Sequence, residues 1–231
     1  MSFEFGPPQR DVDLILAADT QSAISADEGN FFILTGSYSI EAVTKNPHIT
    51  HNDVDVNIFT ADIAKALSDT RKRLKQLNAT LVKQTDSRLE YQRDRSLIEL
   101  QFLTYTSLRQ HETGIEFTMT GLNNSPASIP TTHEILRNSG METYEFRVKS
   151  LAFAIGTWAL RISGVAESQK RRVRQSDIDH FIFLIESPYN RYAVIDAISQ
   201  HPQIPNSYLG KPENVLETAL TIVSQNKAQD E

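Results

Sequence analysis

The chain has 231 residues, no cysteine and a formal net charge of −6. This length allows one large or two small domains with a buried core. The composition excludes disulfides, thiolate zinc sites and cysteine nucleophiles, and the acidic balance excludes a uniformly basic nucleic-acid coat. No window is apolar enough to span a membrane, so we expect no membrane partner and a cytoplasmic protein.

The first 125 residues predict a mixed α/β domain. Helical periodicity or helix-start signals favour helices at 11–26, 38–43 and 61–77, with Thr60 as N-cap of the last. Apolar runs and alternation of apolar with polar residues predict strands between them. The expected strands are 31–35, 53–59, 81–83, 96–106 and 114–120.

Residues 122–130, with two prolines, are the best candidate linker, and the hydrophobic period changes from 2 to 3.6 beyond it. We expect a helical domain at 131–226, with helices at 144–162, 176–185, 190–199 and 212–224. The predicted fold is therefore α/β (α+β): a mixed sheet with flanking helices in residues 1–125, followed by a C-terminal helical domain.

Two short motifs carry chemistry. The apolar run 31–35 ends in Gly36-Ser37, and Asp53 and Asp55 lie one residue apart in the next predicted strand. Glycine allows backbone N–H groups to approach a phosphate, and a helix beginning there favours an anion. Alternate strand residues share a face, so the two carboxylates point the same way and suit Mg²⁺ or Mn²⁺ with a nucleoside triphosphate (NTP). The simpler interpretation is a solvated edge strand, or a turn at His51-Asn52-Asp53.

This pairing resembles the nucleotidyltransferase superfamily that includes polymerase beta. The family pattern is a hydrophobic residue, Gly and Gly or Ser, a spacer, then two acids separated by a hydrophobic residue. Here it is Thr35-Gly36-Ser37, a long spacer, and Asp53-Val54-Asp55-Val56. The resemblance implies a third acid on a neighbouring strand, as metal ligand or base. We favour Glu116, whose strand follows a hairpin, and keep Glu99 as the alternative; either fits an ordinary surface carboxylate.

The later segments resemble AbiEii/AbiGii-type toxin nucleotidyltransferases of abortive-infection and toxin–antitoxin systems, over roughly residues 31–185. Lys149 matches the family's helix lysine and Asp177 its later aspartate, whereas Ser176 and His180 depart from the pattern. The resemblance implies that Lys149 neutralises the triphosphate and that Asp177 orients Lys149 or a metal-bound water. Arg172 or Arg174, close in sequence to Asp177, is a further candidate for phosphate contact, and Arg174 is the one we favour. Two of these residues also have a simpler structural interpretation: Lys149 as a solvated helix lysine, and Asp177 as an acid that complements a helix N-terminus.

These features predict a metal-dependent nucleotidyltransferase that moves NMP from NTP to a hydroxyl acceptor. The resemblance implies an RNA 3′ end such as tRNA, a protein or a small molecule as acceptor, and an antitoxin partner. Basic clusters at 71–75 and 170–174 are solvated faces or contacts to an RNA backbone. The alternatives are an inactive nucleotide- or partner-binding module of the same fold and a helical interaction protein with a chance Asp-Val-Asp.

Overall fold

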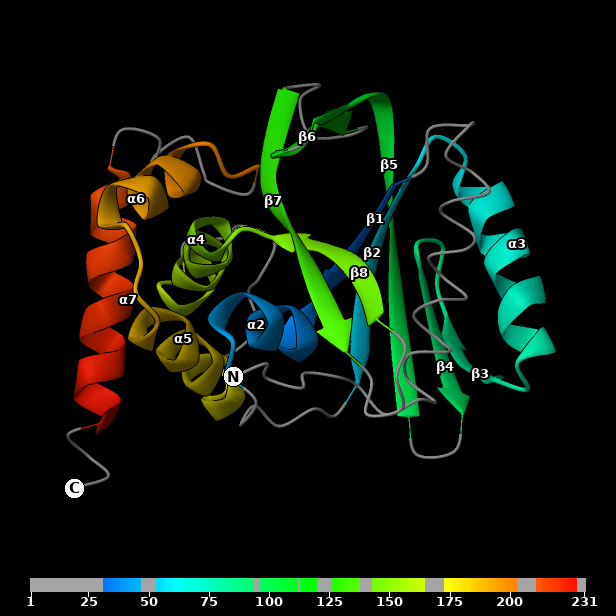
Figure 1. Ribbon diagram of the computed structural model, residues 1–231, viewed down its shortest axis with the longest axis horizontal. Coiled ribbons are helices and arrows are strands. Elements are labelled where there is room, and N and C mark those ends of the chain that lie inside the picture. Colours follow the sequence, from blue (N-terminus) through cyan, green and yellow to red (C-terminus); the bar gives the residue numbers. More distant parts are fainter. Residues whose placement is uncertain are drawn as a thin grey trace. The chain divides into compact units, whose positions relative to one another are not determined.

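The computed structural model describes residues 31–46, 53–93, 96–111, 113–119, 126–137, 143–164, 173–202 and 211–227. The chain divides into two compact units (Figure 1). The first comprises Met1–Pro126 and Thr131–Lys149, and the second comprises Ala127–Pro130 and Ser150–Glu231. Three predicted features lie wholly or partly outside the described residues: the helix expected at 11–26, residues 170–172 of the basic cluster, and residues 47–52 of the spacer.

An eight-stranded sheet forms the first unit, in the order β2-β1-β8-β7-β6-β5-β4-β3 with an additional β2–β5 pairing. Strand β5 pairs with β2 and β4 over its first part and with β6 over its last part. The strands are β1 (Phe31–Thr35), β2 (Val54–Thr60), β3 (Thr80–Gln84), β4 (Arg88–Arg93), β5 (Ser96–His111), β6 (Gly114–Met119), β7 (Pro126–Arg137) and β8 (Thr143–Lys149).

The apolar face of this sheet is covered by α2 (Gly36–Thr44) and α3 (Ile63–Gln76). Alternation along the strands sends every second side chain into this core, because successive strand residues point to opposite faces. Asp62 is the N-cap of α3 and accepts a hydrogen bond from Lys65 N at 3.0 Å, so the expected cap at Thr60 was two residues too early. The core residues include Leu34, Val54, Val56, Leu89, Ile98, Leu100 and Val148 from the strands and Tyr38, Ala66, Leu67 and Leu74 from the helices.

The helix predicted at 144–162 is wrong over its first third. Residues Thr143–Lys149 form β8, and α4 begins only at Leu151, after the N-cap Ser150. The Ser150 hydroxyl accepts a hydrogen bond from Phe153 N at 3.3 Å, as a helix N-cap does. Within 144–149 aromatic and β-branched residues alternate with charged ones, which is the strand period.

Two further expectations about this sheet need correction. Most of the expected linker belongs to strand β7, which begins at Pro126. Strand β4 was not predicted, although Leu89 and Tyr91 alternate with polar residues. The strand expected at 31–35 is confirmed with the same ends, and the other expected strands are confirmed with shifted ends; β5 continues five residues beyond the expected end at 106, to His111.

The second unit is helical after Ser150, whereas residues 131–137 and 143–149, which were expected in the helical domain, belong to strands β7 and β8 of the sheet. Helix α4 (Leu151–Ile162) contacts α5 (Gln175–Glu186), α6 (Arg191–Ser199) and α7 (Pro212–Lys227), which pack around it in Figure 1. Gly156 allows α4 to approach α6 closely, since a Cβ there would lie 3.1 Å from Ile198 Cγ1. The predicted mixed architecture with a helical C-terminal part is confirmed. In the described part of the chain, no helix has the length and apolarity to span a membrane.

Candidate functional site

Strand β2 sets the two aspartates on one face. Val54 and Val56 are buried in the core, whereas Asp53 and Asp55 are half-buried on the opposite face. The strand period alone produces this separation. Successive strand residues point to opposite faces, so acids and apolar residues that alternate along β2 lie on different sides of the sheet. The two carboxylates therefore lie side by side, as the sequence predicts.

The third carboxylate of this group is Glu99. Strand β5 runs parallel to β2 with Glu99 directly beside Asp55 in the register. Carboxylate oxygens of Asp53, Asp55 and Glu99 all lie within 4.8 Å of one another, close enough for a single metal ion. Three hard oxygen donors at this spacing fit Mg²⁺ or Mn²⁺.

Glu116, which the sequence favours, is not a member of this group. It is exposed on β6 and lies opposite Arg109 of β5, in the part of β5 that has left β2. Glu99 and Glu116 both occupy polar positions of alternating strands, so their local sequences are equivalent. The parallel pairing of β2 with β5 distinguishes them, and that pairing joins segments more than 40 residues apart.

Burial and neighbouring charges raise the pKa values of two of these acids, Asp55 and Glu99. Burial, followed by the charges of Asp53 and Glu99, raises the pKa of Asp55 from 3.8 to about 7 against the lowering effect of Arg88. Burial also raises the pKa of Glu99, although Arg88 opposes this shift. Neighbouring carboxylates disfavour each other's charged forms unless a proton or a cation relieves the repulsion. The group is thus built to accept positive charge.

Gly36 brings the start of α2 against this group. Its φ is +65°, and a Cβ on it would lie 2.8 Å from Asp55 Cγ and closer still to Oδ2. Only glycine fits both the left-handed conformation and the contact. Helix α2 begins here, and the side chain of its N-cap residue, Thr35, makes no capping hydrogen bond to the first N–H groups of the helix. Ser37 is buried in the first turn. A helix N-terminus beside a metal-binding group suits a metal–phosphate ligand.

Lys149 ends β8 and does not lie on a helix as expected. Val148 pairs with Leu34 in the parallel β1–β8 register, so Lys149 follows beside Thr35, where β1 leads into Gly36. Its side chain is half-buried, and burial lowers the pKa of the Lys149 amine from 10.5 to about 8. One row of polar residues therefore crosses this face of the sheet, in the order Lys149, Thr35, Asp55, Glu99, Glu90 and Lys83.

Asp177 and Arg174 belong to the second unit, at the start of α5. Asp177 is only 2% exposed; its Oδ1 lies 2.7 Å from Arg161 Nη2, and its Oδ2 accepts a hydrogen bond from Arg174 N at 3.0 Å. Arg174 is the N-cap, and its Nε lies 4.0 Å from Asp177 Oδ2. These contacts cap α5 and tie it to α4, a structural role for Asp177 that needs no substrate.

No protein-family model and no curated protein matches this chain. The solved structures similar to it include nucleotidyltransferases and a nucleotidyltransferase-like protein. The chain is similar to ANT(2'')-Ia in complex with adenylyl-2''-tobramycin at 10% identity and a TM-score of 0.47, over 93% of this chain and 98% of that one. It is similar to the lincosamide antibiotic adenylyltransferase LnuA at 10% identity and a TM-score of 0.44, over 76% and 96%.

A third similar structure is a nucleotidyltransferase-like protein from Paracoccidioides brasiliensis, at 16% identity and a TM-score of 0.41, over 89% and 92% of the two chains. Scores and identities this low do not carry a functional argument.

Proposed function

We propose that this protein is a metal-dependent nucleotidyltransferase that moves NMP from an NTP to a hydroxyl acceptor. The observation that carries the proposal is the convergence of three carboxylates beside a glycine-initiated helix start. Asp53, Asp55 and Glu99 come within 4.8 Å of one another, and Gly36 contacts Asp55 with no space for a side chain.

The three acids would hold Mg²⁺ or Mn²⁺, which when bound offsets charge on the triphosphate and lowers the pKa of the attacking hydroxyl. Gly36 and Ser37 bind phosphate oxygens through backbone N–H groups and a hydroxyl at the start of α2. Lys149 adds positive charge from the neighbouring strand end. These residues hold the NTP so that its α-phosphate faces the acceptor.

The reaction forms a bond between the acceptor oxygen and the α-phosphorus and breaks the bond to the β-phosphate, so pyrophosphate leaves. The proton of the acceptor hydroxyl passes to a carboxylate of the group, for which Asp55 and Glu99, adjacent in the β2–β5 register, are the candidates. Asp177 and Arg174 are not needed for this chemistry and remain predictions for the site.

Label transfer tests the proposal. Purified protein is incubated with each α-phosphate-labelled NTP and Mg²⁺, alone, with total RNA, or with a panel of small hydroxylated amines and sugars. We expect label in one acceptor class with wild type and none with Asp55→Asn. The resemblance to toxin-type enzymes favours RNA such as tRNA or a protein, and co-expression with a candidate antitoxin would test the predicted partner. Binding of NTP with Mg²⁺ but without transfer would favour the inactive binding module.

A further inference from the structure

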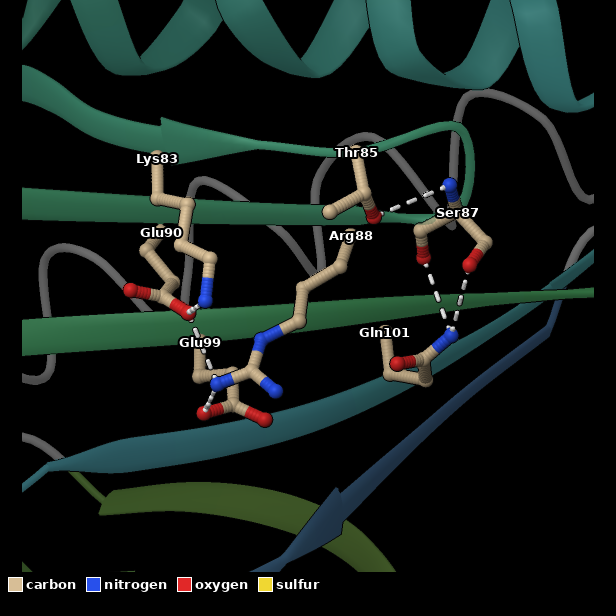
Figure 2. Close-up of polar contacts among 7 residues, drawn as sticks. All are labelled: Lys83, Thr85, Ser87, Arg88, Glu90, Glu99 and Gln101. Atoms are coloured by element: carbon tan, nitrogen blue, oxygen red, sulfur yellow. Dashed lines mark hydrogen bonds and ion pairs between the residues drawn. The ribbon is translucent and has the colours of Figure 1, made fainter.

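Arg88 occupies a position shared between two acids beside the carboxylate group. It extends from β4, and its Nη2 forms an ion pair with Glu99 Oε2 and lies 2.7 Å from Glu90 Oε1 (Figure 2). Glu90 is directly opposite Glu99 in the β4–β5 register, and Lys83 Nζ lies 3.6 Å from the same Glu90 oxygen. One guanidinium nitrogen therefore bridges the third carboxylate of the group and a carboxylate outside it.

The backbone that carries Arg88 is held in place. Gln101 Nε2 donates to Ser87 O at 3.0 Å, Phe102 N donates to the same oxygen at 2.8 Å, and Thr85 N donates to Arg88 O at 2.9 Å. Figure 2 shows the Gln101–Ser87 contacts on one side of Arg88 and the two glutamates on the other. Any change in the Arg88 ion pairs is therefore a movement of its side chain over a short distance, with β4 and β5 unchanged.

The Arg88–Glu99 ion pair has a different effect on stability in the metal-free and in the metal-bound carboxylate group. Without a cation, the Arg88 guanidinium supplies positive charge to three crowded carboxylates. With a divalent cation among them, the same guanidinium faces like charge, and its hold on Glu99 Oε2 competes with coordination. Glu90 then offers an acceptor that Arg88 already contacts.

We infer that Arg88 is a positioning residue that serves as the counter-ion of Glu99 in the metal-free protein and transfers to Glu90 when a divalent cation occupies the group. The inference rests on the proposed function, because it takes Glu99 as a metal ligand. It assigns roles to Arg88 and Glu90, which are two residues outside the ligand set.

The test is Mn²⁺ binding to the full chain without nucleotide, followed by electron paramagnetic resonance, together with thermal unfolding with and without Mn²⁺. We expect Arg88→Met to bind Mn²⁺ about tenfold more tightly, since one charged hydrogen bond no longer competes. Its metal-free form should unfold at a lower temperature, and Mn²⁺ should reduce that difference. Arg88→Lys should restore the wild-type affinity in part.

Glu90→Gln should weaken Mn²⁺ binding, because the alternative acceptor of Arg88 loses its negative charge and holds the guanidinium less strongly. In an Arg88→Met background the same Glu90 substitution should have little effect, which a double-mutant cycle measures. Lys83→Met is the charge control, since it removes a nearby positive charge that does not contact Glu99. A general loss of packing would weaken Mn²⁺ binding in both single variants, whereas the inference requires opposite signs.

Unchanged or weaker Mn²⁺ binding by Arg88→Met, or an equal gain in Lys83→Met, would overturn the inference. If Arg88→Met is not folded, the Arg88→Lys variant and the Glu90→Gln variant decide by the same signs. Absence of Mn²⁺ binding in wild type would overturn both the inference and the metal site. The expected Mn²⁺ response without any transfer of labelled NMP would overturn the enzyme alone and leave the role of Arg88 intact.

Discussion

Gly36 lies against the Asp55 carboxyl, so that a Cβ at Gly36 would meet Asp55 Cγ at 2.8 Å. The contact joins the start of α2 to β2, the strand that carries Asp55. The antiparallel β1–β2 register places Thr35 opposite Asp55. A phosphate at the helix start and a metal ion on Asp55 would therefore be neighbours. This geometry explains why the glycine and the acids belong to one site.

Gly36→Ala should destabilise the protein by more than about 2 kcal/mol, because it adds a steric overlap to an unfavourable positive φ. It should also weaken Mn²⁺ binding, since Asp55 has to move. Gly164→Ala is the matched control: its φ is +71°, but nothing lies within 4 Å of an added Cβ. We expect this control to cost only about 1 kcal/mol and to leave Mn²⁺ affinity unchanged. Urea unfolding and Mn²⁺ titration check both variants; equal effects would contradict the Gly36–Asp55 contact.

Stability of the metal-free protein should depend on pH through Asp55. The folded-state pKa of Asp55 is raised from 3.8 to about 7, so between these values the folded chain holds a proton that the unfolded chain has released. The free energy of unfolding should consequently decrease as pH rises through this range. Urea unfolding in a chelator, from about pH 5 to about pH 8, measures the slope. Asp55→Asn should reduce the slope, and a slope of opposite sign in wild type would refute the assignment.

Lys149 should make nucleotide affinity sensitive to alkaline pH. Burial lowers its pKa to about 8, so its charge is largely present at neutral pH and is lost above that value. NTP binding should weaken as pH rises through this range, and Lys149→Met should bind NTP about tenfold more weakly at neutral pH. Methionine keeps the apolar stem, so we expect the variant to fold. Lys72→Met, on the exposed surface of α3, is the control for loss of one charge; an equal effect there would remove Lys149 from the site.

Asp177→Asn should act on stability and leave metal binding unchanged. The Asp177 carboxylate is buried against Arg161 and caps α5, and removing one partner of a buried ion pair costs about 3 kcal/mol. Asp179→Asn, exposed on the same helix, should change stability by less than about 0.5 kcal/mol. Thermal unfolding and Mn²⁺ titration of the two variants separate the roles. Loss of Mn²⁺ binding by a stable Asp177→Asn protein would instead support its predicted place in the site.

The sequence predicts those parts of the molecule that depend on local patterns. Alternation defines β2 and separates Asp55 from Val56, and the Gly36-Ser37 motif marks the start of α2. The strand at 143–149 was missed because Val148 also fits the helical period of the residues that follow, while the stop at Ser150 is a local capping contact. Local patterns also identified most of the helices in the second unit.

What local patterns do not contain is the pairing of distant strands. Glu99 and Glu116 have equivalent neighbours in sequence, and only the β2–β5 register brings Glu99 beside Asp55. The ion pairs of Arg88 could not be predicted for the same reason. They depend on the register of β4 with β5, and β4 itself was not predicted. Lys149 was expected near the phosphates from the resemblance, but its place beside Thr35 follows from the parallel β1–β8 pairing.

The central claim is that Asp53, Asp55 and Glu99 together hold the metal ion of a metal–NTP complex. The most direct measurement is Mn²⁺ binding in the presence of a non-hydrolysable NTP, by electron paramagnetic resonance, for wild type, Asp55→Asn, Glu99→Gln and Glu116→Gln. We predict that Asp55→Asn and Glu99→Gln lose at least about tenfold in Mn²⁺ affinity, because each removes a charged oxygen ligand, while Glu116→Gln binds as wild type does. Wild-type affinity in Glu99→Gln, or a loss confined to Glu116→Gln, would contradict the account.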